Sequence, residues 1–390
     1  MPMGFKTKKE YLDYRQSVTD FLWKDVEPLV EAMDEENNIP QDILFPRFRK
    51  MGMFGLIIPE EYGGMGLTTT QYLPILAEMA KISGAVRALI HVHLTAARAI
   101  VVYGRDEQKQ TYLPKMATGE SSLAFCMTEQ NSGSGLDCKT NAVKKGDTYI
   151  LNGEKHLITN ADFTDLFMVA CFTGPKDLGR KAMSALIVEK DTPGFTIEPM
   201  PHLMGSKGLG HGILTFKDCE IPVANVVGEE GMGIDVFLGE LEASRVFVAA
   251  SSLGTAQRAL EESIKYAKNR VTFGKPIAQR ESIRALLADM AMDIYGLRLM
   301  LEDVAKKIDA GQSCPLEASI TKTQGLETVC RVTEKAMQVL GGRSYLQSYP
   351  IERLLRDGWL NVLEEGTPTI QRLVTARALL AGERPSSFPW

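Results

Sequence analysis

Cysteine and histidine are scarce in this 390-residue chain, and neither is spaced as a metal site requires. No two of the six cysteines are separated by two residues, and the five histidines come close together only at His91 and His93. The residues around that pair are typical of a helix rather than of a strand that would present both rings on one face. We therefore expect no metal site, and we expect the thiols to be reduced.

The chain also lacks an excess of positive charge and long uninterrupted apolar runs. Its formal net charge is −5, so we expect no basic surface that would attract nucleic acid. Charged residues interrupt the longest apolar segments, so no membrane-spanning helix is expected. Residues 1–10 contain no apolar signal core, and Glu10 and Asp13 argue against a transit peptide. The expected location is cytoplasmic.

What the chain does contain is a region of short strands between two helical regions. Its length exceeds what one hydrophobic core usually organises. Apolar residues recur at helical spacing in the first region, including a long segment at 69–103. We predict an α+β fold of three domains: an all-α domain at 1–120, a β domain at 121–230 and a helical domain at 231–390.

Short-range patterns support the second and third domains. Apolar runs separated by turns predict strands, and Asn152-Gly153 predicts the turn of a β-hairpin. Long amphipathic segments with short connections then predict an antiparallel bundle; they span 236–268, 282–310, 315–340 and 369–381.

Two adjacent carboxylates, Glu364 and Glu365, follow an apolar run and precede Gly366. Thr367 then fits the N-cap of a helix, with Pro368 at its first position. A carboxylate held just before a helix N-terminus, beside a glycine that lets a ligand approach the backbone, suits a general base. Local sequence alone leaves a solvated acidic turn open. Within the whole chain, we predict that Glu365 is the base.

Further loops combine polar groups with glycine. The loop at 128–134 offers hydroxyl and N–H groups that suit a flavin edge or a phosphate, and the hydroxyl of Thr159 could lie over a bound ring. The segment 270–276 carries two cations and an aromatic residue, which suit a pyrophosphate. Gln338 precedes two glycines at a predicted helix end. Each loop alone is also compatible with an ordinary turn or cap.

Together these features resemble the acyl-CoA dehydrogenase family over essentially residues 10–382. The resemblance implies an N-terminal helical domain, a middle β-barrel and a C-terminal four-helix bundle. The motifs that carry it occur in the family's order: Pro59 to Gly64, Asp106 to Lys109, Thr128-Glu129, Asn152 to Lys155, Ile158 to Asn160, Arg270 to Pro276, Leu287 to Met290, Gln338 to Gly342, Arg353 with Arg356-Asp357, and Glu365 to Thr367.

The resemblance also implies the reaction. Glu365 would remove the α-proton of an acyl-CoA thioester while the β-hydrogen leaves as hydride to N5 of FAD, giving the 2-enoyl thioester. An apolar pocket would raise the pKa of Glu365 and strengthen it as a base. The implied partners are an electron-transfer flavoprotein as electron acceptor and further copies of the chain in a homotetramer, a dimer of dimers. Such enzymes serve the degradation of fatty or other carboxylic acids.

The family's binding residues map onto two sets of positions. The implied substrate contacts are Ser134, Arg245, Glu364 and Gly366. Residues near 270 and 340 would reach the FAD of a neighbouring subunit. The full set implied to contact FAD is Phe125, Met127, Thr128, Leu157, Ile158, Thr159, Arg270, Thr272, Phe273, Gln338, Gly341, Gly342, Thr367 and Thr369.

The chain departs from the family pattern near the expected flavin and acyl group. Glu364 stands where an aromatic residue is common, and a second carboxylate is expected to raise the apparent pKa of the pair or to face solvent. Leu157 stands where Trp is usual. Ser244 occupies the place where some branches carry their base, which leaves Glu365 without that competitor. A cyclic, branched or dicarboxylic acyl group is therefore an alternative to a straight chain.

Other family activities remain as alternatives. An acyl-CoA oxidase or an enoyl-CoA reductase would share the fold and differ in oxygen reactivity or direction. A non-catalytic member that binds nucleic acid would need a basic surface and a C-terminal extension, and we expect neither in this acidic chain.

Overall fold

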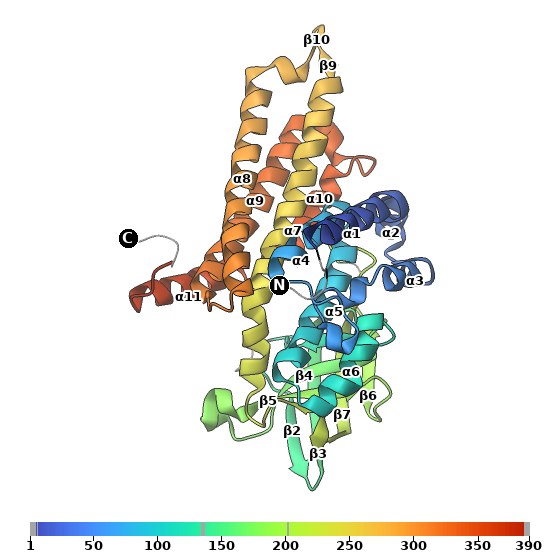
Figure 1. Ribbon diagram of the computed structural model, residues 1–390, viewed down its shortest axis with the longest axis vertical. Coiled ribbons are helices and arrows are strands. Elements are labelled where there is room, and N and C mark those ends of the chain that lie inside the picture. Colours follow the sequence, from blue (N-terminus) through green and yellow to red (C-terminus); the bar gives the residue numbers. More distant parts are fainter. Residues whose placement is uncertain (1–4, 6, 134–136, 201–202, 386–390) are drawn as a thin grey trace.

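The computed structural model describes residues 5, 7–133, 137–200 and 203–385. The strands of the middle region lie at one end of an elongated molecule and the long C-terminal helices extend to the other end (Figure 1). The N-terminal helices pack beside the junction of the two. This arrangement confirms the predicted α+β fold in the order helices, strands, helices.

The N-terminal region is helical, but the predicted segment 69–103 is two helices rather than one. Ser83 is extended between them, and its side chain caps the second helix by accepting from the Val86 N–H. Gly84 N–H donates to Asp357 Oδ2 at 3.0 Å, which ties this helix start to the C-terminal region. The helices are α1 (Lys8–Phe21), α2 (Val30–Glu36), α3 (Gln41–Lys50), α4 (Thr69–Ile82), α5 (Gly84–Tyr103) and α6 (Asp106–Thr118).

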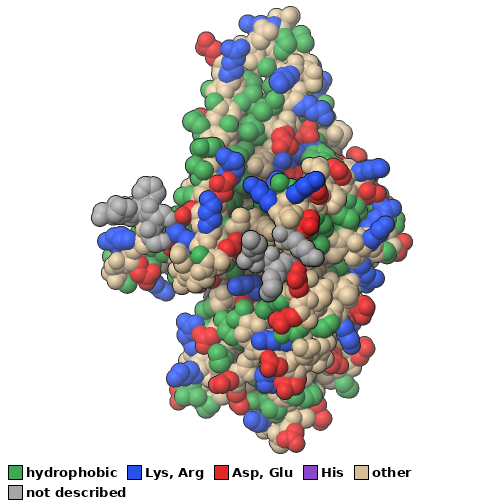
Figure 2. Space-filling view, in the orientation of Figure 1, with side chains coloured by type: hydrophobic (Ala, Val, Ile, Leu, Met, Phe, Trp, Pro, Cys, Tyr) green, Lys and Arg blue, Asp and Glu red, His purple; other side chains and the backbone are tan. Residues whose placement is uncertain are grey.

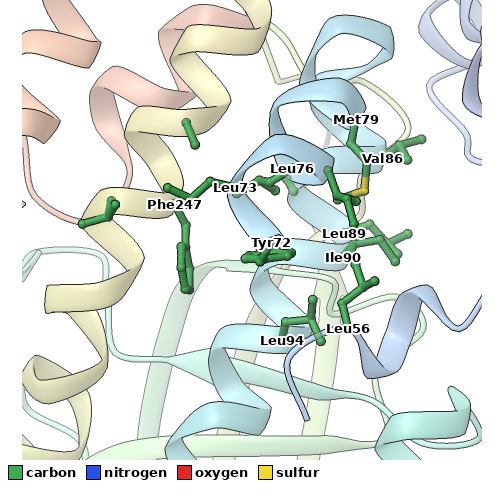
Figure 3. Close-up of a cluster of buried hydrophobic side chains, with 14 of the residues drawn as sticks. Leu56, Tyr72, Leu73, Leu76, Met79, Val86, Leu89, Ile90, Leu94 and Phe247 are labelled. Atoms are coloured by element: carbon green, nitrogen blue, oxygen red, sulfur yellow. The ribbon is translucent and has the colours of Figure 1, made fainter. Parts of the chain in front are cut away.

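Helix α5 is long and apolar enough to cross a membrane, contrary to our expectation for this chain, but 78% of its most apolar stretch is buried. Figure 3 shows its side chains packed against those of α4, with Phe247 beside Leu73 and Tyr72 of α4. Each fully buried side chain of this size contributes about 1.5–3 kcal/mol to folding. Helix α5 is thus a core helix, and it carries Arg87 and His91 into the interior.

The middle region is one eight-stranded sheet in the order β6-β7-β3-β2-β4-β5-β8, with β1 parallel to β4. Every strand contributes to one apolar cluster, including Tyr149, Phe167 and Phe216, so the sheet curls around a shared core. The strands are β1 (Leu123–Cys126), β2 (Asn141–Lys145), β3 (Thr148–Thr159), β4 (Leu166–Phe172), β5 (Met183–Glu189), β6 (Phe195–Pro199), β7 (His211–Pro222) and β8 (Val226–Val227).

The predicted hairpin turn at Asn152-Gly153 is wrong. Strand β3 runs through both residues, and the chain reverses at Gly146-Asp147 instead. Gly153 has a φ of 143°, lies at an irregularity in the β3–β7 pairing, and would place a Cβ 2.6 Å from Thr140 Cα. The glycine is needed for a close approach of two chain segments, not for a turn.

The C-terminal helices form the predicted bundle with one change of membership. Helices α7, α8 and α9 pack on one another, and α10 packs against α7 and α9, whereas α11 packs against α9 and buries only Gln371. Helix α10 therefore takes the place predicted for 369–381. The helices are α7 (Gly233–Asn269), α8 (Glu281–Asp309), α9 (Pro315–Leu340), α10 (Ile351–Leu363) and α11 (Pro368–Leu380).

Candidate active site

The turn between α10 and α11 holds Glu365 in a strained conformation. Helix α10 ends at Glu364, Glu365 has a φ of 54°, and α11 begins with Thr367 as N-cap and Pro368 at its first position. A left-handed backbone at a non-glycine residue costs about 1–3 kcal/mol and persists only where its surroundings hold it. The sequence predicted the cap and the proline; it contained no sign of the strain.

Buried Lys322 of α9 holds this turn. Its Nζ donates to the carbonyl oxygen of Glu364 at 2.5 Å and to that of Gly366 at 2.8 Å. Gln371 Nε2 donates to the Glu365 carbonyl oxygen at 3.2 Å. Burial lowers the pKa of Lys322 to about 8, against the opposing influence of Glu365 and Glu364. Donors therefore reach the carbonyl groups of three consecutive residues, which fixes the direction of the Glu365 side chain.

The two carboxylate oxygens of Glu365 differ in their surroundings. Oε1 lies 3.0 Å from His91 Nε2 on α5 and accepts from Ser244 Oγ on α7 at 2.5 Å. Within the described part of the chain, Oε2 is buried and has no hydrogen-bond partner. A buried oxygen without a partner is uncommon and costly, so Oε2 is free to act on a bound molecule.

The expectation that the pocket raises the pKa of Glu365 is wrong. Burial does raise it, but the interactions with His91, the Lys322 ammonium and the Ser244 hydroxyl together outweigh burial, and the pKa is lowered. The pocket around this carboxylate is polar rather than apolar. Glu365 is therefore held in its ionised form, which is the form that accepts a proton.

Glu364 does not face solvent, which was one of the two courses expected for it. Its side chain is 16% exposed, and its Oε1 lies 2.9 Å from NH2 of Arg87, whose side chain is 1% exposed. The same Arg87 nitrogen donates to Asn361 Oδ1 at 2.6 Å, and Ser251 Oγ donates to that oxygen at 3.1 Å. Glu364 is thus the anion of a buried ion pair between α5 and the end of α10.

The strand residues predicted to contact FAD lie at the neighbouring ends of β1 and β3. The His156 N–H donates to the Thr128 carbonyl oxygen at 2.8 Å, which places the end of β1 beside the end of β3. Thr159 Oγ1 lies 3.1 Å from His211 Nε2, and burial lowers the pKa of that histidine. Leu157 has a φ of 57° and is 52% exposed. Met127 directly follows β1, Ile158 is near the end of β3, and Phe125 packs on Phe237 of α7.

The bundle residues predicted to contact FAD lie elsewhere in the same chain. Arg270, Thr272 and Phe273 are in the α7–α8 connection at the far tip of the bundle, where β9 (Val271–Thr272) and β10 (Lys275–Pro276) pair (Figure 1). Phe273 is 95% exposed and lies under Arg280, whose NH2 donates to Thr272 Oγ1 at 2.6 Å. The remaining bundle positions are at the end of α9 (Gln338, Gly341, Gly342) and the start of α11 (Thr367, Thr369).

Three of the four predicted substrate contacts, Arg245, Glu364 and Gly366, are among the described residues. Ser134 lies outside the described residues. Arg245 follows Ser244 on α7; burial lowers its pKa although Glu365 and Glu242 act in the opposite direction. Gly366 has a φ of 93°, and a Cβ there would meet Gln371 Nε2 at 2.7 Å. Arg245 and Gly366 therefore border Glu365, while Glu364 turns to Arg87.

Sequence reasoning missed three buried groups that contact the turn of Glu364 and Glu365. His91 sits in an apolar helix segment, and Lys322 and Arg87 each occupy a position among buried neighbours. Their signal was a charged or titratable residue on an otherwise apolar helix face, which is rarely buried without a partner. Ser244 was singled out only as a position without a carboxylate.

Comparison with known proteins identifies the class to which this fold and site belong. The N-terminal, middle and C-terminal domain models of acyl-CoA dehydrogenase match residues 8–120, 124–219 and 231–380. The chain therefore belongs to the acyl-CoA dehydrogenase family. It is an oxidoreductase of that family, whose members are flavoproteins that bind FAD.

The relatives agree over nearly the whole chain and differ in substrate. An acyl-CoA dehydrogenase of Bacillus subtilis (strain 168) is 38% identical, over 96% of this chain and 99% of the relative. An acryloyl-CoA reductase (NADH) of Anaerotignum propionicum is 36% identical, over 97% and 96%. A cyclohex-1-ene-1-carbonyl-CoA dehydrogenase of Syntrophus aciditrophicus (strain SB) is 36% identical, over 94% and 88%. At this similarity the substrate does not follow from the relatives.

Solved structures show the same fold. Butyryl-CoA dehydrogenase from Megasphaera elsdenii superposes with a TM-score of 0.92 at 33% identity, over 97% of this chain and 100% of that one. A chain from a study of the electron transferring flavoprotein of Acidaminococcus fermentans gives a TM-score of 0.92 at 34% identity, with the same coverage.

Proposed function

We propose that this protein dehydrogenates an acyl-CoA thioester between its α and β carbons, with Glu365 as the base that removes the α-proton. The observation that carries the proposal is the free, buried Oε2 of an ionised Glu365 on a turn held by Lys322. Bound FAD would accept the β-hydrogen as a hydride at N5. The chain's own part is to hold the ionised carboxylate in one direction and to keep water from it.

The residues at the strand ends fit a flat flavin ring. Leu157 is an apolar side chain that its left-handed backbone holds half exposed beside the end of β1, which suits contact with a ring face. We propose that the residues Phe125, Met127, Thr128, Leu157, Ile158 and Thr159 hold the ring, that Thr367 and Thr369 contact the same cofactor, and that Ser134, Arg245 and Gly366 contact the thioester.

A second copy of the chain accounts for the bundle residues. Phe273, at the bundle tip, is almost fully exposed, and Tyr345 beyond α9 is 86% exposed. Figure 2 shows apolar side chains gathered along the bundle, and α8 exposes Met292, Tyr295 and Leu299. Exposed apolar surface of this kind marks a contact with another protein. We propose a homotetramer in which Arg270, Thr272, Phe273, Gln338, Gly341 and Gly342 reach a neighbour's FAD.

The ion pair of Glu364 and Arg87 favours an uncharged acyl group over a dicarboxylic one. Glu364 also acts electrostatically on His211, the partner of Thr159, so the pair is within electrostatic reach of the proposed flavin face. A buried guanidinium there would attract a carboxylate at the far end of an acyl chain. Because Glu364 already neutralises it, a straight, branched or cyclic acyl group without charge is the substrate class that we propose.

One structural match and one relative bear on the electron acceptor and on the direction of the reaction. The structural match to a chain from an electron transferring flavoprotein study supports such a flavoprotein as acceptor. The relative named acryloyl-CoA reductase (NADH) supports the reverse reaction, reduction of an enoyl thioester, as the second candidate. An oxidase would reduce oxygen rapidly once its flavin is reduced. We keep the cytoplasm as the proposed location, to be tested by cell fractionation.

The first experiment is a panel of CoA thioesters scored by bleaching of flavin absorbance. The purified protein is expected to be yellow, and Glu365→Gln is expected to bind FAD but to lose about 10²–10⁴-fold in turnover, the typical contribution of a general base. A colourless protein that takes up no flavin would refute the proposal. Turnover of Glu365→Gln near that of the wild type would place the base elsewhere.

The acyl class is tested with Glu364→Gln. This variant leaves Arg87 without its anion, so its activity on glutaryl-CoA relative to butyryl-CoA is expected to rise about 10-fold or more, as for one charge-assisted hydrogen bond of about 1.5–3 kcal/mol. Glu302→Gln, which loses the contact to Arg298 within α8, is the control. An unchanged ratio in Glu364→Gln would show that Arg87 does not face the acyl group.

A further inference from the structure

Two buried side chains meet at Glu365 and have no part in the proposed function so far. His91 on α5 and Ser244 on α7 are fully buried. Both contact Oε1 of Glu365, at 3.0 and 2.5 Å, and they lie 3.1 Å from each other. The hydroxyl of Thr95 lies 3.4 Å from that of Ser244. These polar groups converge on one of the two carboxylate oxygens and leave the other alone.

We propose that His91 and Ser244 are positioning residues that saturate Oε1 of Glu365 and thereby select Oε2 as the atom that receives the substrate's α-proton. This inference rests on the proposed function, because it assumes that Glu365 is the base. Two donors use the lone pairs of Oε1, whereas both lone pairs of Oε2 remain. A proton can then be accepted at Oε2 without breaking an existing hydrogen bond.

The proton transfer to Glu365 needs no group other than the carboxylate, the substrate and the cofactor. The α-carbon–hydrogen bond breaks and an O–H bond forms at Oε2 of Glu365. The electron pair of the broken bond moves into the new carbon–carbon double bond, and FAD, when bound, would supply the acceptor for the β-hydrogen and its electron pair. Neither His91 nor Ser244 gains or loses a proton, so both act through Glu365.

The surroundings of His91 fix the tautomer that this role requires. Its Nε2 faces Oε1, whereas Nδ1 is buried and has no partner among the described residues. The ring of Phe247 stands edge-to-face to the imidazole with centroids 5.9 Å apart. The tautomer that fits carries its proton on Nε2 and donates it to Oε1.

Charged and titratable groups lie around His91 and Glu365 on the helices packed there. The substitutions tested below leave these groups unchanged. They are Tyr72 on α4, Arg87 on α5, Arg245 on α7, Lys322 on α9, and Glu364 before the turn. Removing one donor from the ionised Glu365 raises the pKa of its carboxyl, since hydrogen bonds to the charged form favour that form.

The test compares His91→Phe, His91→Gln and Ser244→Ala in the holoenzyme across pH. Loss of a donor is expected to move the acidic limb of the kcat profile upward by about one pH unit in His91→Phe and in Ser244→Ala. Glutamine retains an N–H donor, so His91→Gln is expected to restore most of the shift. Infrared difference spectra of each variant against its Glu365→Gln counterpart, titrated without substrate, follow the Glu365 carboxyl directly. Its titration is expected to move to higher pH in His91→Phe and Ser244→Ala, and much less in His91→Gln.

His93→Gln is the matched control, because His93 is a buried histidine two residues along the same helix that contacts the carbonyl oxygens of Phe54 and Met116 instead. Its acidic limb is expected to stay in place. Wild-type limbs in both His91→Phe and Ser244→Ala would overturn the inference, as would an equal shift in His91→Gln. If His91→Phe does not fold, Ser244→Ala decides alone. Wild-type turnover in Glu365→Gln would instead refute Glu365 as the base in the proposed function. Failure of the proposed function is therefore distinguishable from failure of this inference.

Discussion

Replacing Lys322 with methionine separates the stability of the turn from its function. Methionine fills a similar volume without the ammonium, so the carbonyl groups of Glu364 and Gly366 lose their donor. Two hydrogen bonds to a charged group are worth about 3–6 kcal/mol. The pKa of Lys322 falls from 10.5 to about 8, which corresponds to a burial cost of about 3 kcal/mol for the charged form that methionine does not bear.

The lost hydrogen bonds and the removed burial cost largely cancel in the free energy of unfolding, but they do not cancel in catalysis. Lys322→Met is expected to lower the free energy of unfolding at pH 7 by about 0–3 kcal/mol. Without the lysine nothing holds the left-handed Glu365 from the α9 side, and a misplacement of about 1 Å can cost about 10²-fold in rate. We therefore expect kcat to fall by about 10² or more while the protein remains folded and binds FAD.

The pH dependence of unfolding checks the burial of the charge. Because the folded pKa is lowered, the unfolded chain binds more protons than the folded chain between about pH 8 and pH 10.5. The free energy of unfolding of the wild type should therefore rise relative to Lys322→Met across that window, by about 3 kcal/mol. Urea unfolding of both proteins at pH 7.5, 8.5, 9.5 and 10.5 measures it, with an unchanged m-value as the condition for comparison.

Lys81→Met is the control, since Lys81 pairs with Glu261 between α4 and α7 away from the turn. It should lose no more than about 1 kcal/mol and keep its kcat. A Lys322→Met protein with wild-type kcat would refute the reasoning that the lysine positions Glu365. A relative stability that does not rise with pH would refute the assignment of a charged, buried amine.

Two further substitutions test the elements that support the site. Gly153→Ala would place a Cβ 2.6 Å from Thr140 Cα at a φ of 143°, so we expect a loss of about 1–3 kcal/mol, seen as a lower Tm; an unchanged Tm would contradict the close approach. Asp357→Asn is expected to lose about 1–3 kcal/mol in urea, because the carboxylate accepts from Gly84 and Ser206 N–H groups, and an amide nitrogen would face one of these donors; a stability equal to that of the wild type would show that these bonds are dispensable.

The sequence predicted best the features that depend on a few adjacent residues. The Thr367-Pro368 helix start, the α9 bounds at 315–340 and the strand at 166–172 all appear as expected. Capping, proline geometry and local periodicity decide such features without help from distant chain. The order of helices, strands and helices follows from the same signals.

The errors arose where a distant segment decides the local outcome. Asn152-Gly153 has the strongest short-range turn signal, yet Thr140 on another segment accounts for the glycine. Ser83 divides one apolar segment into two helices, and the first N–H of the second, that of Gly84, is bound by Asp357, more than 270 residues away. Helix periodicity alone does not reveal such partners. The polarity of the Glu365 pocket was misjudged for the same reason.

The doublet of Glu364 and Glu365 shows how two identical neighbours come to differ. Glu364 closes α10 with an extended backbone, whereas Glu365 is left-handed, so their side chains leave the chain in different directions. One meets a buried arginine and the other a histidine and a serine. Lys322 holds the carbonyl groups of Glu364 and Gly366, on either side of Glu365. The conformation of a single residue thus assigns one carboxylate to charge compensation and leaves the other with a free oxygen.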